Sequence, residues 1–158
     1  MSLLAIDPGS EQSAIMWIAH NGLPKKFDIM PNEHLIEHIR GICAPETGWH
    51  HLAIEMIASY GMPVGAEVFE TCVWIGRFIQ AWGGPFTKIY RREVKSFLCG
   101  DSKAKDGNIR QALIDRYGGS SAIGNKKSPG PLYGITKDVW AALAVAVTWQ
   151  GTHGKQAA

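Results

Sequence analysis

The sequence Leu3-Leu4-Ala5-Ile6-Asp7-Pro8-Gly9-Ser10 ends an apolar run with a single acidic residue, and Pro8 and Gly9 stop the strand directly after it. A carboxylate at the edge of a hydrophobic core is costly unless a cation pairs with it. Asp7 is therefore either a metal ligand or a residue that only accepts hydrogen bonds in the turn. Acids at comparable positions later in the chain decide between these two roles.

The length of 158 residues fits one domain, which we place at 1–150 with a C-terminal tail at 151–158. A hydrophobic fraction of 46% and a charged fraction of 19% are typical of a globular protein. We find no apolar run of membrane-spanning length and no basic segment before the first hydrophobic stretch, and we therefore expect a cytoplasmic protein. Three widely spaced cysteines argue against a disulfide framework and a CxxC zinc site.

Charge is distributed unevenly along the chain. Residues 1–85 contain four Lys or Arg and nine Asp or Glu, whereas residues 86–137 contain eleven basic residues against four acids, an excess of seven. Such a local excess suits a polyanion such as nucleic acid. The alternative is a basic face that only contacts solvent.

The hydrophobic pattern predicts an α/β fold. Strands are expected at 3–7, 13–19, 26–30, 51–56 and 86–90, and helices at 32–43, 64–82, 91–98, 107–117 and 136–149. The first three strands form an antiparallel meander and the later ones alternate with helices, which predicts a mixed sheet flanked by helices. Asn32 and Asp106 are candidate N-caps, and the Gly- and Lys-rich segment 118–134 is a long loop.

Two further acids stand at positions comparable to Asp7. Glu55 lies at the end of the strand predicted at 51–56, and Asp138 lies in the first turn of the last helix. Converging carboxylates repel unless a divalent cation lies among them, and ligation by oxygen alone favours Mg²⁺ or Mn²⁺ over zinc. Two such ions, ~4 Å apart, support phosphodiester hydrolysis. We therefore predict a nuclease with Asp7, Glu55 and Asp138 as catalytic and metal-binding residues.

Four motifs in order carry a family resemblance. They are Ala5-Ile6-Asp7-Pro8-Gly9-Ser10, Ala53-Ile54-Glu55, Arg92-Glu93-Val94-Lys95 and Asp138-Val139-Trp140-Ala141-Ala142-Leu143-Ala144-Val145-Ala146. With them, nearly the whole chain resembles the RuvC-like Holliday junction resolvases of the ribonuclease H-like superfamily, and in particular a phage or otherwise divergent member.

The resemblance implies a ribonuclease H-like mixed sheet and a homodimer that resolves four-way DNA junctions by paired nicks. Each active site would use two Mg²⁺ or Mn²⁺ ions and no small-molecule cofactor. Asp7 would bridge the ions, and Glu55 and Asp138 would each help to hold one. If the protein is phage-encoded, the resemblance places it in the cytoplasm of a bacterial host.

One position departs from the family pattern. The family has another acid one helical turn after Asp138, where this chain has Ala141. Solvent could complete the shell around Asp138, because Mg²⁺ commonly keeps bound waters. Alternatively, a non-homologous acid such as Glu11 or Asp101 reaches the site, or the second metal binds weakly. The sequence leaves these alternatives open.

The resemblance also indicates DNA contacts. In the family, the loop after the second acid faces the junction centre, which makes Tyr60 a candidate for stacking on an unpaired base, with a core tyrosine as the alternative. Predicted phosphate contacts are Lys88, Arg91, Arg92, Lys95, Lys103, Lys105 and Arg110. Among them, Lys95 and Lys105 are the preferred pair.

The helix predicted at 64–82 is the expected dimer element, because two active sites must be spaced to meet symmetric strands. Its expected apolar stripe consists of Val68, Phe69, Cys72, Val73, Ile75 and Ile79. In this prediction Trp74 and Phe78 lie beyond the stripe and are available to the partner.

Three other functions compete with junction resolution. The same metal site could act on flaps and other branched DNA, and Ala141 makes a non-catalytic or weakly catalytic junction-binding protein credible. Actin-like ATPases also begin with an Asp-x-Gly strand turn, but they need a duplicated domain of much greater length and a second phosphate loop. The nuclease reading fits this chain length better.

Overall fold

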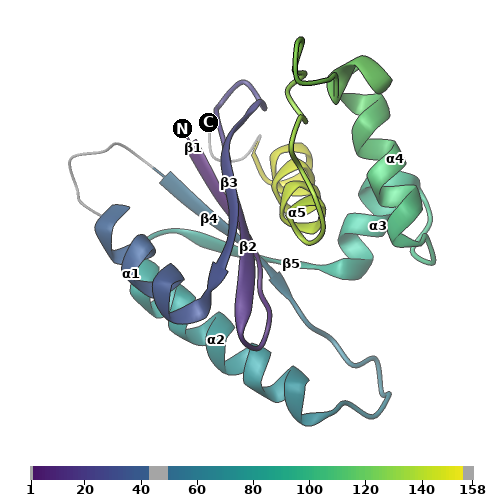
Figure 1. The fold of residues 1–158 in the computed structure, drawn as a ribbon. Helices are drawn as coiled ribbons and strands as arrows, with labels where there is room; N and C mark the ends of the chain where they lie inside the picture. Colours follow the sequence, from purple (N-terminus) through teal and green to yellow (C-terminus); the bar gives the residue numbers. More distant parts are fainter. Residues whose placement is uncertain (1, 43–49, 155–158) are drawn as a thin grey trace.

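The computed structural model describes residues 2–42 and 50–154, which form one mixed sheet between two layers of helices (Figure 1). The strands are β1 (Ser2–Asp7), β2 (Gln12–Ile18), β3 (Pro24–Pro31), β4 (His50–Met56) and β5 (Phe86–Tyr90). Their order in the sheet is β3-β2-β1-β4-β5. β1, β2 and β3 pair antiparallel, whereas β4 pairs parallel with both β1 and β5, which confirms the predicted mixed sheet.

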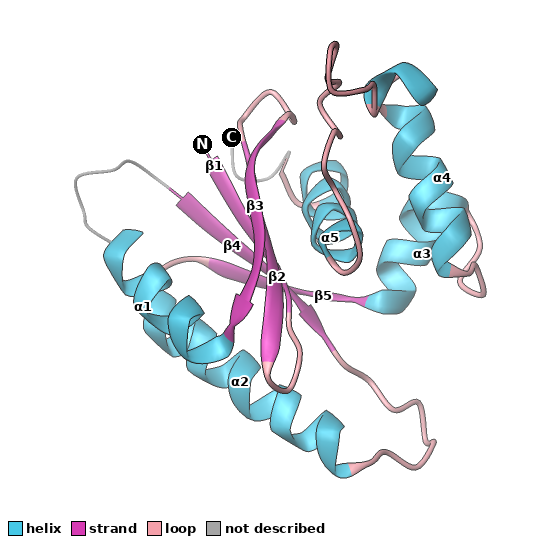
Figure 2. Ribbon diagram, in the orientation of Figure 1, coloured by secondary structure: helices cyan, strands magenta, loops and turns pink. Residues whose placement is uncertain are grey.

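Helices cover both faces of the sheet (Figure 2). They are α1 (Asn32–Ile42), α2 (Ala66–Trp82), α3 (Arg91–Cys99), α4 (Asp106–Arg116) and α5 (Val139–Thr152). α1 and α2 pack on one face, and α5 with α3 and α4 packs on the other. The predicted loop 118–134 contains one short 3-10 helix, Ser120–Ala122. Within the described residues, no helix combines the length and apolarity needed to cross a membrane.

Alternation along β1 decides which face of the sheet receives the first acid. Leu4 and Ile6 lie in the hydrophobic cluster with α1 and α2, whereas Leu3 and Ala5 lie in the cluster with α5. Because successive side chains of a strand point to opposite faces, Asp7 follows Leu3 and Ala5 toward α5.

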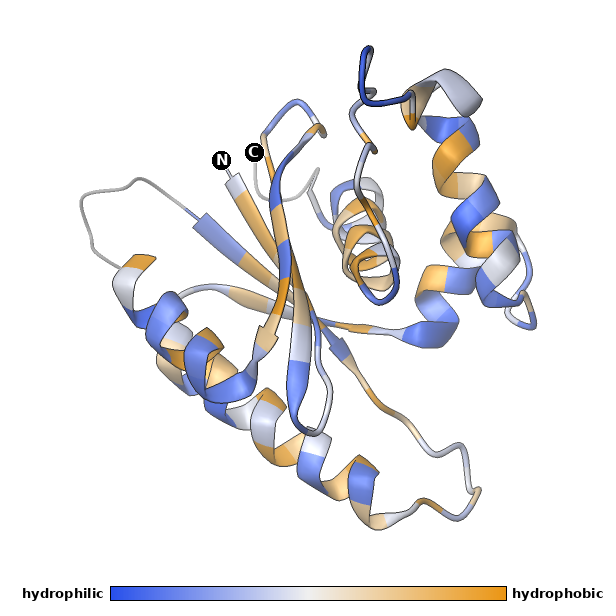
Figure 3. Cartoon of the chain, in the orientation of Figure 1, coloured by the Kyte–Doolittle hydropathy of each residue, from blue (hydrophilic) through white to orange (hydrophobic). Residues whose placement is uncertain are grey.

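The close approach of α5 to the sheet depends on small side chains on both surfaces. These are Ala5, Ala14 and Ala53 on the strands and Ala142, Ala144 and Ala146 on the helix, all buried. Figure 3 shows α5 and the middle of β1 in hydrophobic colours. A tightly packed α5 fixes the position of the segment that leads into it, which carries Asp138.

The pairing register brings the second acid beside the first. In the parallel pair of β1 and β4, Ala5 lies opposite Ala53 and Ile6 opposite Ile54. The next positions, Asp7 and Glu55, therefore stand at the carboxyl ends of neighbouring strands. Glu55 shares the parity of Ala53, which lies in the α5 cluster, so both carboxylates belong to the same face.

Asn32 does not act as the N-cap predicted for the first helix, because it is buried and ties the β1–β2 turn instead. Its Nδ2 donates a hydrogen bond to the carbonyl oxygen of Gly9 at 2.9 Å, and its Oδ1 accepts one from the Ser13 hydroxyl at 2.6 Å. A Cβ on Gly9 would lie 2.3 Å from the carbonyl oxygen of Gln12, so only glycine fits there. These contacts fix the backbone just after Asp7.

The predicted rotation of the long helix α2 is only partly correct, because Ile75 is buried and Ile79 packs on the core as expected, but Trp74 packs there too. Phe78 is fully buried and packs with Thr71, Ile75 and Trp82 toward the core, so Phe78 is not available to a partner. Phe69 and Val73, predicted to face the core, are 61% and 57% exposed. Apolar residues lie on every side of this helix, so periodicity alone does not determine its rotation.

Candidate active site

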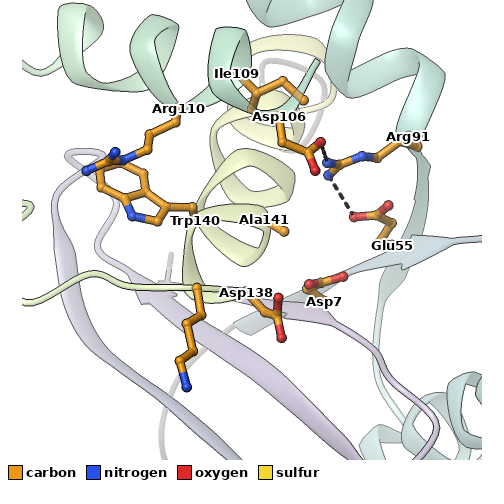
Figure 4. A pocket seen from close by; sticks show the side chains of 10 residues that line it. Asp7, Glu55, Arg91, Asp106, Ile109, Arg110, Asp138, Trp140 and Ala141 are labelled. Carbon is orange, nitrogen blue, oxygen red and sulfur yellow. Dashed lines mark hydrogen bonds and ion pairs between the residues drawn. The ribbon is translucent and has the colours of Figure 1, made fainter. Parts of the chain in front are cut away.

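The three predicted acids line one cavity of about 260 Å³ on the α5 side of the sheet (Figure 4). Asp7 is the last residue of β1, Glu55 lies at the end of β4, and Asp138 directly precedes α5. The other lining residues are Arg91, Asp106, Ile109, Arg110, Lys137, Trp140 and Ala141. We call this cavity the acid pocket. It brings together all three residues that the sequence assigned to the metal site.

Asp138 occupies the N-cap position of α5 rather than its first turn. Its carbonyl oxygen accepts hydrogen bonds from the backbone N–H groups of Ala141 and Ala142 at 3.0 and 3.1 Å. Lys137, directly before it, has φ +48°, a left-handed conformation that costs a non-glycine residue ~1 kcal/mol or more. Lys137, the residue in this strained conformation, lines the acid pocket.

The pocket carries negative charge that is poorly compensated. Burial, followed by the nearby carboxylates of Glu55 and Asp138, raises the pKa of Asp7 from 3.8 to about 8. Burial also raises the pKa of Glu55, although the positive charge of Arg91 opposes that change. A cation placed among these groups would relieve both the desolvation and the repulsion.

Arg91 lies inside the acid pocket, although the sequence analysis assigned it to DNA phosphates. Its Nη1 is 3.7 Å from Oε2 of Glu55, and its Nη2 forms an ion pair with Asp106. Figure 4 shows the guanidinium between these two carboxylates. Arg91 begins α3 directly after β5, next to the end of β4, and this position turns its side chain toward Glu55.

The acid pocket fits a divalent cation by its chemistry. In the part of the chain that the structure describes, no three His, Cys, Asp or Glu side chains already stand at metal-binding spacing. However, Oε2 of Glu55 is buried and accepts no hydrogen bond from the described residues, and Asp7 bears a carboxylate that burial disfavours. Carboxylate oxygens are the ligands that Mg²⁺ and Mn²⁺ prefer, with waters completing the shell.

Asp106 is the acid that the sequence analysis missed at this site. It was expected to cap the helix after it, but Lys105 occupies the N-cap and Asp106 is the first residue of α4. Ala141, at the position where the resemblance implied a further acid, lines the same pocket as Asp106, whereas Glu11 and Asp101 do not line it. The alternation of basic and acidic residues around 101–106 gave no signal that distinguished Asp106 from Asp101.

The predicted phosphate contacts divide into two groups. Arg110 lines the acid pocket, where its guanidinium lies 5.0 Å from the centre of the Trp140 ring, and Arg91 lies among the carboxylates. The others, which do not line the pocket, are Lys88, Arg92, Lys95, Lys103 and Lys105. Lys95 is nevertheless close enough to oppose the rise in the pKa of Glu55. Lys137 lines the pocket and was absent from the predicted contacts.

Tyr60 is not a core residue, so that alternative is wrong. Its side chain is 62% exposed and its φ is +49°. The Arg92 guanidinium lies 5.8 Å from the centre of its ring. The structure therefore leaves Tyr60 free to contact a ligand.

Two solved structures of RuvC from Thermus thermophilus match this fold. One aligns with a TM-score of 0.68 and 15% sequence identity over 99% of this chain and 97% of its own. The other, T. thermophilus RuvC in complex with Holliday junction substrate, aligns with a TM-score of 0.69 and 14% identity over 99% and 96%. No protein-family model and no curated protein sequence matches the chain. The chain therefore has a RuvC-like fold.

Proposed function

We propose that this protein is a divalent-metal-dependent endonuclease that resolves four-way DNA junctions by paired nicks. The observation that carries the proposal is the convergence of Asp7, Glu55 and Asp138 on one pocket. The pocket lies in a chain whose RuvC-like fold extends over 99% of its length. The T. thermophilus RuvC that shares this fold binds a Holliday junction substrate, which supports branched DNA as the partner.

Asp7, Glu55 and Asp138 would hold one or two Mg²⁺ or Mn²⁺ ions in the acid pocket. Bound ions supply an activated water and stabilise the leaving oxygen of the phosphodiester. Arg110 and Lys137, on the same pocket, attract the phosphate and hold it against the carboxylates. The raised pKa of Asp7 means that cation binding at this residue also releases a proton near neutral pH.

Arg91 gives the metal-free pocket its own counter-ion. The single positive charge of the guanidinium is shared between Glu55 and Asp106, so it offsets only part of the repulsion among the four carboxylates of the pocket. If Glu55 held a cation, Arg91 would keep Asp106 as its partner and would have donors left for a phosphate oxygen. This arrangement makes Asp106 a positioning residue for Arg91.

The test of the proposed function is cleavage of a synthetic four-way junction beside a linear duplex and a flap, in Mg²⁺ and in Mn²⁺. We expect symmetric nicks in the junction and none with Asp7→Asn. Equal cutting of flap and junction would indicate a broader branched-DNA nuclease rather than a junction resolvase. Junction binding without metal-dependent nicking would indicate a catalytically weak junction-binding protein, the function that Ala141 would favour.

We propose the exposed face of α2 as the dimer element, through Phe69 and Val73. Both side chains are more than half exposed. Burial of an apolar side chain of this size in an interface contributes ~1.5–3 kcal/mol of favourable free energy. A symmetric pair of α2 helices would use this face twice and place two acid pockets on one assembly. The proposal moves the expected contact from Phe78 to the opposite side of the helix.

Sedimentation equilibrium tests this dimer with Val73→Asp, and Gln111→Asp on the exposed face of α4 is the matched control. We expect a wild-type dimer at micromolar concentration, a monomeric Val73→Asp variant and a dimeric control. A monomeric wild-type protein would exclude paired nicking by a stable dimer.

A further inference from the structure

The loop between α4 and α5 carries a basic turn that lies outside the acid pocket. Lys126 and Lys127 are adjacent and both exposed at the tip of this loop. The segment 116–137 contains four basic residues and no acid. Figure 1 shows the loop projecting past the end of α4, and Figure 3 shows its tip in hydrophilic colours. We call residues 124–129 the lysine hairpin.

Hydrogen bonds hold the two lysines in a tight turn. The backbone N–H of Asn125 donates to the carbonyl oxygen of Ser128, and the N–H of Ser128 donates to the carbonyl oxygen of Asn125, both at 3.1 Å. Oδ1 of Asn125 also accepts hydrogen bonds from the backbone N–H groups of Lys127 and Ser128, at 2.9 and 3.0 Å. These bonds use backbone atoms and the Asn125 side chain, so the turn does not need the two lysine side chains.

The base of the lysine hairpin is fixed to the core. The backbone N–H of Gly130 donates to the carbonyl oxygen of Ile123 at 3.1 Å, and that of Leu132 donates to the carbonyl oxygen of Ala122 at 2.8 Å. Ala122 and Leu132 are buried in the hydrophobic cluster that contains α5. A Cβ on Gly124 would collide with backbone atoms on the other side of the hairpin, so only glycine fits there. The hairpin is therefore a rigid extension of the core that holds two positive charges in one place.

The charges of Lys126 and Lys127 are not used inside the described part of the protein. Within residues 2–42 and 50–154, no carboxylate forms an ion pair with either ammonium group. Like charges on adjacent residues repel, so this pair does not stabilise the fold. A ligand with successive negative charges would relieve the repulsion, and the phosphates along a strand of DNA form such a series.

The lysine hairpin lies on the same side of the sheet as the acid pocket. Its base packs in the cluster with α5, and the carboxylates of the acid pocket also lie on the α5 side. α4 connects the two, because Asp106, Ile109 and Arg110 near its start line the acid pocket and the hairpin follows its other end. A helix of 11 residues is ~16 Å long, which corresponds to about five phosphates along one strand of a duplex.

We propose that the lysine hairpin contacts the sugar–phosphate backbone of a duplex arm of the DNA substrate, at least about five nucleotides from the phosphate in the acid pocket. The proposal rests on the proposed nuclease function and adds a contact with the arm to it. Lysine binds phosphate oxygens without reading the bases, so the hairpin would set the direction of the arm and not select its sequence.

The experiment is a thermodynamic cycle between the two lysines and the charge of the DNA backbone. Fluorescence anisotropy in Ca²⁺ measures the Kd of the full chain for four-way junctions in which three successive phosphates of each arm are replaced by neutral methylphosphonates. The neutral window is moved outward from the branch point. At one window in the outer part of the arm, the replacement weakens wild-type binding by about 3- to 30-fold, the range expected for one or two lost phosphate contacts.

The double variant Lys126→Ala/Lys127→Ala completes the cycle. It binds the unmodified junction more weakly by a similar factor, lowers the slope of log Kd against log salt by about 2, and no longer responds to the neutral window. Lys25→Ala/Lys26→Ala is the matched control, because these two lysines on β3 are also adjacent and exposed and do not line the acid pocket. The control has the same change in net charge, and it keeps the wild-type Kd and salt slope.

The proposal fails if the hairpin variant keeps the wild-type Kd and salt slope, if the control variant loses as much affinity as the hairpin variant, or if the neutral windows weaken both proteins equally. A protein that cuts junctions but gives one of these results keeps the proposed function and loses the hairpin contact. A protein that shows the coupling but does not cut keeps the hairpin contact and loses the nuclease.

Discussion

Arg91 and Arg92 are neighbours in the chain but belong to two different regions of the surface. Arg91 lies among the carboxylates of the acid pocket, and Arg92 lies against the exposed ring of Tyr60. The first region is charged and partly buried, which suits the proposed chemistry on a phosphodiester, and the second is aromatic and open to solvent. The contrast predicts that substitutions one residue apart change different measurable quantities.

Glu55→Gln tests the proposed role of the acid pocket in cleavage and should have the largest effect. We expect the single-turnover cleavage rate to fall by about 10³-fold, because a neutral amide holds a cation poorly and the transition-state charge loses its partner. Junction affinity, measured by anisotropy in Ca²⁺, should stay within about threefold, since recognition lies elsewhere. Glu37→Gln, at an exposed surface pair with Arg40, is the control and should leave both quantities unchanged.

A loss of junction affinity as large as the loss of cleavage would contradict the separation of the two regions. It would mean that Glu55 acts in DNA binding as well as in the chemical step.

Asp7→Asn should stabilise the metal-free protein. The pKa of Asp7 is raised from 3.8 to about 8, so its contribution to folding is fully present below pH 4 and is lost as the pH rises toward 8. Asparagine does not ionise, so the variant does not lose this stability at high pH. We expect its Tm to be roughly 5–10 °C above that of the wild-type protein at pH 8 and close to it at pH 4. Thermal unfolding in EDTA measures the difference.

Magnesium provides the matching control for this stability effect. Mg²⁺ should raise the Tm of the wild-type protein at pH 8 and leave that of Asp7→Asn unchanged, because ligand binding to the native state stabilises it. A difference between the two proteins that is the same at every pH would contradict the assignment to ionisation of Asp7.

Strand geometry explains why the core of the acid pocket could be predicted from the sequence. Asp7 and Glu55 each end a recognisable strand, and parallel neighbours bring their carboxyl ends to one edge of the sheet. Asp138 was also predictable, because it opens the last apolar helix and such a helix must pack on the sheet. The order of the elements, the alternation of side chains along each strand and the direction of the parallel strands were sufficient to predict that these three acids meet.

The surroundings of the pocket could not be predicted in the same way. Arg91 and Lys88 look alike in a basic segment, and only the geometry at the start of α3 turns Arg91 toward Glu55. The contact of Tyr60 with Arg92 depends on the loop after β4 returning against α3, which is a long-range contact without a periodic signal.

The rotation of α2 escaped prediction for a different reason. Its apolar residues surround the whole helix, so Phe69 and Phe78 were equally acceptable as core residues until the sheet selected Phe78. α5 is apolar on nearly every side as well, and it is buried almost throughout, so no such choice arose there.

Arg91→Gln and Arg92→Gln compare the two neighbours directly. Removal of the Arg91 charge, 3.7 Å from Glu55, takes away a competitor for the cation. We expect Mn²⁺ to bind Arg91→Gln about 10-fold more tightly by calorimetry, which corresponds to ~1.4 kcal/mol. Arg92→Gln should bind Mn²⁺ as the wild-type protein does. Equal Mn²⁺ affinities in all three proteins would show that Arg91 does not hold Glu55 in solution.

Lys95→Ala and Lys105→Ala should have the smallest effects, and they test the predicted phosphate contacts. Each change should weaken junction binding a few-fold and lower the slope of log Kd against log salt by about 1, because one fewer counter-ion is released. The penalty should be similar for junctions of different base sequence, since phosphates are present in all of them. A lysine variant with an unchanged salt slope would lie outside the DNA path.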